Sequence, residues 1–425
     1  MRYSAGAAAR QILAERIGDD QIADPLAGQA GSALWALSRQ NSAPELLQLA
    51  ASASHAVRSE DVPRDVSRRM YGAVNRASIT RLETYAQCPF QHFVQYGLRP
   101  EPLEPPELDA RDEGDFYHEA VKQYMDAPGL EDAEALARMD RLTDALVAQM
   151  FPEERYGESA VTRYHIETLR GTARSAARSL SKQLKAGKFV PTMLEVRFGD
   201  QEPRVVLHAE GGGVVLDGRI DRIDEWKDEN VHYLRVIDYK RGSRELDLGE
   251  VYFALQLQLI VYLAAAMKKT GGKSAGAYYF RISDPVLATD ERDSEAVDDM
   301  RDDKMRLRGL LPDDMSVIRA MAEDPEKVFS VRINKDGTLR SGALQVSDEE
   351  LNRLIRHVLK EAERIVGEIR SGRTDIAPVK MGAMDGCTYC KYRAICQRDG
   401  KLPGGNARKL PKMKPAEVLD RLKNE

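Results

Sequence analysis

Three polar residues at the ends of two expected strands have the types and spacing needed to hydrolyse a phosphodiester. Asp221 lies in the first strand, and Asp238 and Lys240 end the second. Side chains alternate along a strand, so Asp238 and Lys240 project together while Tyr239 points away. Carboxylates hold Mg²⁺, the metal activates a bound water, and an ammonium orients that water or stabilises the developing charge. A surface ion-pair cluster is the alternative, and it explains either strand alone better than both together.

Residues on two expected helices can complete such a site. His118 lies in a helix expected over residues 116–124 and offers a further metal ligand, although a helical histidine is more often a packing residue. Gln258 and Tyr262 lie one turn apart on the same face of a helix expected over residues 248–269. These three residues strengthen the prediction of a site around the strand ends.

The four cysteines of the chain form a second candidate site. Cys387, Cys390 and Cys396 have the spacing C-x₂-C-x₅-C, and Cys88 lies about 300 residues earlier. Four thiolates suit either Zn²⁺ or an iron–sulfur cluster, and spacing alone does not separate these metals. Three close cysteines with one remote partner favour a [4Fe–4S] cluster, since structural zinc usually uses two close pairs. Such a centre would close a very long loop and stabilise the domain; four unrelated buried thiols are the alternative.

The elements that position these residues follow an α/β order. Strand-like alternation begins at Thr192 and recurs in five segments, which are residues 192–199, 204–210, 213–226, 232–242 and 276–282. Amphipathic helices are expected over 248–269 and 347–370, the latter capped by Ser347. Helices interleaved with strands predict an α/β core.

The expected domain organisation places both candidate sites in one domain over residues 76–400. Before it, residues 1–75 read as a helical segment, with helices at 8–17, 32–39 and 44–57. The proline-rich run 101–114 reads as a loop or linker, and residues 401–425 as a C-terminal tail of little structure.

Composition leaves most classes open but excludes two. The chain has 425 residues, of which 42% are apolar and 31% charged, as is ordinary for a globular protein. No apolar run is long enough to span a bilayer and the N-terminus lacks a signal-peptide pattern, so we expect a cytoplasmic protein without a membrane partner. The net charge of −5 neither supports nor excludes binding to nucleic acid.

Six segments together carry a resemblance to a known family. They read SITRLETYAQCPFQHFVQYGL, GDFYHEAV, GRIDRID, VIDYKRG, LQLQLIVYL and CTYCKYRAIC. Over about Ser78 to Gln397 the chain resembles the C-terminal nuclease domain of the AddB family, which supplies one of the two subunits of bacterial AddAB helicase–nucleases. These domains belong to the RecB-like PD-(D/E)XK superfamily. The resemblance implies a restriction-endonuclease-like core with a mixed central sheet flanked by helices.

The resemblance also implies a role for each candidate residue. His118, Asp221, Asp238 and the backbone carbonyl of Tyr239 would bind Mg²⁺, and Lys240 would be the catalytic lysine. Gln258 and Tyr262 match a QxxxY element that contacts DNA or supports the site. The family's [4Fe–4S] ligands match the four cysteines, which are Cys88, Cys387, Cys390 and Cys396.

The implied function is an exonuclease that cuts the 5′-terminated strand at DNA ends during double-strand break repair. Its partners would be single-stranded DNA ends, an AddA-type helicase subunit and the helicase-like part of AddB, of which residues 1–75 are interpreted as a remnant. The chain contains no G-x-x-x-x-G-K-[ST] motif, so we expect no ATP hydrolysis by it. The alternatives are a stand-alone iron–sulfur exonuclease of the CRISPR-adaptation type and a non-catalytic DNA-binding or scaffolding module.

Overall fold

The computed structural model of the chain divides into two compact units. The sheet unit comprises Asn75–Thr80, Glu101–Arg364 and Met413–Glu425, and the cysteine unit Met1–Val74, Arg81–Pro100 and Ile365–Lys412. The residues that the structure describes are 60–71, 75–100, 108–127, 131–152, 156, 159–200, 202–228, 231–242, 244–285, 287, 294–340, 342–398 and 406–425. The three helices expected before residue 58 lie outside them.

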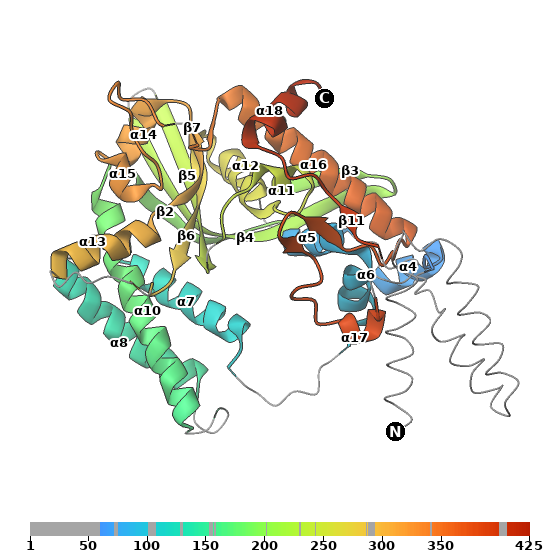
Figure 1. Cartoon of the computed structure of the whole chain (residues 1–425), viewed down its shortest axis with the longest axis horizontal. Coiled ribbons are helices and arrows are strands. Elements are labelled where there is room, and N and C mark those ends of the chain that lie inside the picture. The colour runs from blue at the N-terminus through green and yellow to red at the C-terminus, as the bar shows by residue number, and fades with distance from the viewer. Residues whose placement is uncertain are drawn as a thin grey trace, which may run out of the picture. The chain divides into compact units, whose positions relative to one another are not determined.

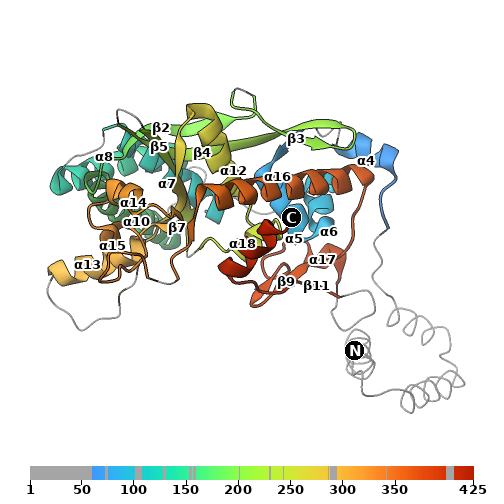
Figure 2. The ribbon, with the colours of Figure 1, turned by 90° about the horizontal axis from the view of Figure 1, so that it is seen from above.

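The sheet unit is built on one eight-stranded mixed sheet (Figure 1). Its strands are β1 (Arg76–Ser78), β2 (Val190–Phe198), β3 (Val205–Ala209), β4 (Gly212–Asp228), β5 (Val231–Arg241), β6 (Lys273–Ile282), β7 (Arg308–Pro312) and β8 (Gln345–Val346). The main path runs β1-β4-β5-β6-β7-β8, and the long strand β4 pairs with β2 along one part and with β3 along another (Figure 2). The five expected strands are confirmed as β2 to β6, and so is the mixed α/β fold.

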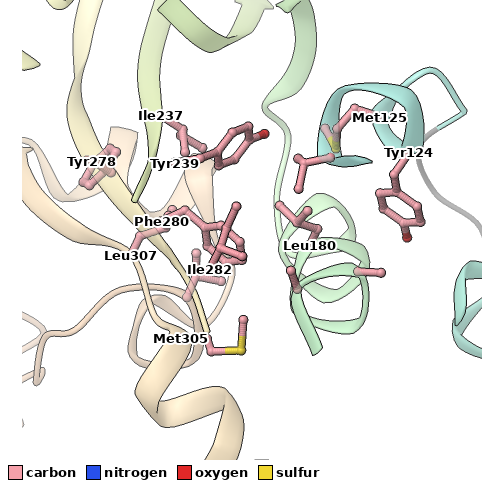
Figure 3. Close-up of a cluster of buried hydrophobic side chains, with 14 of the residues drawn as sticks. Tyr124, Met125, Leu180, Ile237, Tyr239, Tyr278, Phe280, Ile282, Met305 and Leu307 are labelled. Atoms are coloured by element: carbon pink, nitrogen blue, oxygen red, sulfur yellow. The ribbon is translucent and has the colours of Figure 1, made fainter. Parts of the chain in front are cut away.

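One face of this sheet carries a large apolar core. Residues Ile237 and Tyr239 of β5 and Tyr278 and Phe280 of β6 point into it (Figure 3). The helices that pack there are α7 (Ala110–Met125), α8 (Asp132–Met150), α10 (Ala160–Lys185), α14 (Met315–Met321) and α15 (Pro325–Val328). Another helix, α13 (Ser294–Met305), adds Met305. Because strand side chains alternate, the neighbouring residues of β5 and β6 face the other side.

Helix α12 (Gln258–Thr270) packs against β4, β5 and β6. The single helix expected over 248–269 is wrong, since α11 (Leu248–Tyr252) ends before α12 begins. The break has no Gly or Pro to announce it. Ala254 takes a left-handed φ of 61°, and the buried side chain of Gln256 bonds the backbone at Glu245 and Asp247. Those backbone bonds stabilise the turn in place of helical ones.

Two further expectations differ from the structure. Helix α7 begins at Ala110, inside the run expected to be a loop, because Asp109 and Asp112 form a reciprocal capping box that starts it. Residues 401–425 contain α18 (Pro415–Lys423), which buries Val418 and Leu422. Among the described residues, no helix is both long and apolar enough to cross a bilayer.

The cysteine unit joins two segments that are distant in sequence. Its elements are α4 (Arg64–Tyr71), α5 (Ile79–Gln87) from Arg81 on, α6 (Pro89–His92), the π-helix η1 (Phe93–Leu98), α16 (Asp348–Ser371) from Ile365 on, β9 (Val379–Met381), β10 (Met384–Asp385), α17 (Arg393–Cys396) and β11 (Arg408–Lys409). The Tyr85 hydroxyl donates to Glu368 Oε2 at 3.0 Å. The backbone N–H of Phe90 donates to Asp375 O, also at 3.0 Å. These bonds hold the early helices against the late strands.

Candidate active site

The site forms where the β4–β5 ladder ends. The last paired residues are Arg222 and Ile237, and Asp221 and Asp238 come next on the two strands. Both carboxylates are buried, at 4% and 1% exposure. The backbone N–H of Tyr239 donates to Asp221 Oδ2 at 2.7 Å, which fixes this carboxylate at the point where the strands part.

His118 and a residue that sequence reasoning missed, Glu195, complete a group around Asp221. His118 Nδ1, on α7, lies 3.4 Å from Asp221 Oδ1 and 3.9 Å from Glu195 Oε1. One ligand atom from each of these three residues lies within 4.8 Å of the others. Three converging donors of this kind can coordinate a divalent cation.

The backbone of Glu195 is strained, with φ at 52° in the middle of β2. Its neighbours Leu194 and Val196 pair regularly with Arg222 and Ile220 of β4, which places Glu195 opposite Asp221. A left-handed glutamate costs about 1–3 kcal/mol and persists where the surrounding structure enforces it. The sequence signal was an acidic residue inside an apolar strand, but its partner became apparent only from the β2–β4 register.

Lys240 and Asp238 form a close pair on the same face of β5, as the alternation predicted. Lys240 Nζ lies 2.5 Å from Asp238 Oδ2. Burial raises the pKa of Asp238 to about 6; Lys240 opposes this shift, while the charge of Asp221 adds to it. Asp238 Oδ1 is buried and has no hydrogen-bond partner among the described residues. One oxygen of this carboxylate is therefore available to a ligand.

The charge balance around His118 favours a cation. Burial by itself would lower the pKa of His118, but hydrogen bonds to the Asp221 and Glu195 carboxylates raise it to about 10. Arg219 Nε lies 2.8 Å from Glu195 Oε2 and balances part of this negative charge. Hard carboxylate oxygens with one imidazole are donors that suit Mg²⁺ or Mn²⁺. The residues present thus fit a divalent metal.

Gln258 and Tyr262 touch each other beside the carboxylates. Gln258 Nε2 donates to the Tyr262 hydroxyl at 2.9 Å. Burial raises the pKa of Tyr262, and the charges of Asp238 and Asp221 raise it further. Tyr262 therefore lies within electrostatic reach of the site, which the spacing of the two helical residues alone did not establish.

The four cysteines line one small pocket of the cysteine unit. All four are free thiols, and Cys88 is buried immediately before α6. Burial raises the pKa of Cys88, Cys387 and Cys390. The Arg398 guanidinium donates to Cys387 Sγ at 3.6 Å. A bound cation is the ordinary means of holding such buried sulfurs as thiolates.

A second charged cluster lies on the opposite face of β4 and β5, directly behind the carboxylates. Arg222 Nε lies 2.5 Å from Asp224 Oδ1, and Arg235 Nε lies 2.8 Å from Asp224 Oδ2. All three side chains are fully buried. The Arg235 guanidinium also lies 5.3 Å from the centroid of the Phe189 ring. We call these three residues the arginine–aspartate triad.

Fold and site together define a class. Residues 76–397 match the PD-(D/E)XK nuclease superfamily, and the chain belongs to it. The matched range contains the four cysteines and every residue of the carboxylate site.

Curated relatives share one description, which names each as the B-type subunit of an ATP-dependent helicase/deoxyribonuclease. The protein of Alkaliphilus metalliredigens is 31% identical over 379 residues, covering 84% of this chain and 33% of the relative. That of Symbiobacterium thermophilum is 35% identical over 388 residues, covering 86% and 33%. That of Moorella thermoacetica is 34% identical over 368 residues, covering 81% and 32%. The chain thus spans about a third of the length of these relatives.

Proposed function

We propose that this chain is a metal-dependent DNA exonuclease domain that hydrolyses phosphodiesters with Asp221, Asp238 and Lys240. The observation that carries the proposal is the convergence of His118 and Glu195 on Asp221, beside the Asp238–Lys240 pair. The superfamily assignment supports the reaction class. Resemblance and donor chemistry make Mg²⁺ the metal of choice.

The chain's own residues have distinct tasks in this mechanism. His118, Glu195, Asp221 and Asp238 would hold the metal, with the Tyr239 carbonyl as a further ligand. Mg²⁺, when bound, supplies a Lewis acid and an activated water. Lys240 keeps an ammonium beside Asp238, where it stabilises the negative charge that develops on the attacked phosphate.

We further propose that the domain acts within an AddAB-type helicase–nuclease of the cytoplasm and degrades 5′-terminated strands at DNA ends. The shared description of the relatives supports both a DNA substrate and a helicase partner. It also favours this assignment over a stand-alone CRISPR-type exonuclease. A non-catalytic module is disfavoured because the lysine and both aspartates are in place.

We propose a [4Fe–4S] cluster for the four cysteines. A single tetrahedral Zn²⁺ with bonds of about 2.3 Å would draw its sulfurs to about 3.8 Å from one another. No three of these four described cysteines have their sulfurs within 4.8 Å. The wider spacing suits a larger metal centre and agrees with the family resemblance.

Degradation of end-labelled single-stranded DNA tests the nuclease. The full chain, purified without oxygen, should degrade it with Mg²⁺ and stop with EDTA, and Lys240→Ala should be inactive. Lys269→Ala, a surface lysine of α12, is the matched control and should retain activity. Equal cleavage by wild type and Lys240→Ala would overturn the proposal.

Metal content tests the cluster separately. The anaerobic chain should be brown and contain about four irons and four sulfides, and Cys88→Ser should lose them and melt at a lower temperature. A colourless protein with one zinc per chain would contradict a cluster while leaving the nuclease proposal intact.

A further inference from the structure

A pocket of about 360 Å³ at the β7 edge of the sheet unit is lined mainly by cations. Its lining includes Lys304, Arg306, Arg308, Arg332 and Arg340, with Asp303 as the single carboxylate. Two of the arginines flank the start of β7, and two belong to the segment between α15 and β8. We call it the arginine pocket.

The strand register relates this pocket to the carboxylate site. Asp238 of β5 pairs with Tyr279 of β6, and Tyr279 pairs with Arg308 of β7. Residues paired in this way project from the same face of a sheet. At about 4.8 Å per strand, the Cα atoms of Asp238 and Arg308 lie about 10 Å apart. The pocket and the carboxylates therefore share one face.

Positive charge continues between the two places. Lys240 pairs in register with Arg281 of β6, so Arg281 also projects from the active-site face. Arg281 is partly buried, and its Nε has no hydrogen-bond partner among the described residues. Just before β7, the residues on either side of Arg306 face the apolar core, which turns Arg306 toward the same side as Arg308.

Existing ion pairs neutralise only part of this charge. Arg306 contacts Asp303, and Arg308 contacts Glu245. The exposed Arg332 lies 3.5 Å from Glu326. Neither Arg340 nor Lys304, both exposed, makes an ion pair with a described residue. The pocket therefore keeps an excess of cationic groups, as a binding site for an anion requires.

We propose that the arginine pocket binds a backbone phosphate of the DNA strand that the carboxylates cut. This inference rests on the proposed function and adds a subsite to it. At a rise of about 3.4 Å per nucleotide, 10 Å corresponds to about three nucleotides from the scissile bond. Guanidinium groups suit this task because their forked N–H donors match phosphate oxygens. Contact with phosphate alone would position the strand without reading its sequence.

Binding of a 20-nucleotide single strand in EDTA tests the subsite without hydrolysis. In the full chain, Arg332→Gln combined with Arg340→Gln removes two exposed cations and leaves the metal site untouched. Each lost phosphate contact should reduce the salt slope of log K by about 0.7, so the pair should reduce it by about 1.4. Arg141→Gln with Arg163→Gln, on exposed faces of α8 and α10, is the matched control and should leave the slope unchanged.

Cleavage as a function of substrate length separates the subsite from the nuclease itself. With Mg²⁺, kcat/KM on a 12-nucleotide strand should fall roughly tenfold or more in the double variant. A dinucleotide, too short to reach the pocket, should be cut equally by all forms. Equal slopes and equal cleavage of the long strand in double variant and control would overturn the inference. Failure of the wild type to cut any DNA would instead overturn the proposed function, and the binding experiment would still test the pocket.

Discussion

The two faces of β4 and β5 carry charged clusters of opposite balance. On the core side, two arginines surround Asp224, and the carboxylate contacts both at 2.5–2.8 Å. On the other side, Asp221 and Asp238 are joined by Glu195, with Lys240 and Arg219 as the nearby cations. The first cluster has more positive than negative groups, and the second has the reverse once His118 is neutral.

This difference separates a structural cluster from a functional one. Burial would raise the pKa of Asp224, but Arg222 and Arg235 hold it below its ordinary value. Burial also raises the pKa of Asp238, and there Lys240 does not overcome the effect. A buried carboxylate with its partners in place stabilises a fold, whereas one without enough partners is satisfied by a metal.

Changing Asp238 to Asn should have the largest effect. The substitution preserves shape and removes the charge that binds metal, so cleavage should fall by roughly 10³-fold or more. Unfolding in EDTA should be no easier than in wild type, because an inadequately paired buried charge is gone. Cleavage assays and denaturant titrations measure the two quantities. Lower stability together with full activity would invert the comparison.

The same change at Asp224 should act on stability. Asp224→Asn leaves two buried arginines without a counter-charge, which should cost about 3–5 kcal/mol of unfolding free energy. Urea denaturation measures this loss. Asp217→Asn, a partly exposed aspartate of the same strand, is the control and should cost under about 1 kcal/mol. A loss at Asp224 no greater than at Asp217 would remove the triad's structural role.

The pH dependence of the metal-free protein should sharpen the contrast. The folded pKa of Asp238, about 6, lies above the unfolded value of about 3.9. Its protonation therefore favours folding below about pH 4, and this contribution is lost as pH rises through 6. Relative to Asp238→Asn, wild type in EDTA should lose about 3 kcal/mol between pH 4 and 7. A parallel pH profile for the two proteins would contradict the burial argument, and Mg²⁺ should restore the lost stability.

The smallest effect concerns the backbone of Glu195. Glu195→Gly should be more stable than Glu195→Ala by about 1 kcal/mol in EDTA, because glycine adopts a positive φ without strain. Both variants should bind Mg²⁺ more weakly, as calorimetry would show. Equal stability of the two would indicate that the left-handed conformation carries no cost.

The sequence predicted the residues that lie on single elements better than those that depend on pairing. Asp238 and Lys240 share a face because they are two apart in one strand, and the structure places them in contact. Glu195 was missed, since its proximity to Asp221 depends on the register of β2 against β4. The arginine–aspartate triad was missed for the same reason, as its members come from two paired strands.

Local breaks were also beyond sequence reasoning. The apolar pattern continues through residues 248–269, yet Gln256 makes backbone bonds that compete with the helix. Ala254 gives no sign of its left-handed conformation. By contrast, α16 was predicted almost to its ends, because Ser347 and Glu350 provide a capping signal.

The discontinuous cysteine unit imposes an order on synthesis. The segment around Cys88 packs against strands and turns that follow residue 365, and its pocket needs Cys387 to Cys396. At roughly 5–20 residues per second, a ribosome needs about 15–60 s to make the intervening 300 residues. During that interval Cys88 has no partner thiols, while the strands that carry Asp221 and Asp238 have already emerged. Assembly of the thiol pocket is therefore the late event in the biosynthesis of this chain, after the active-site strands are complete.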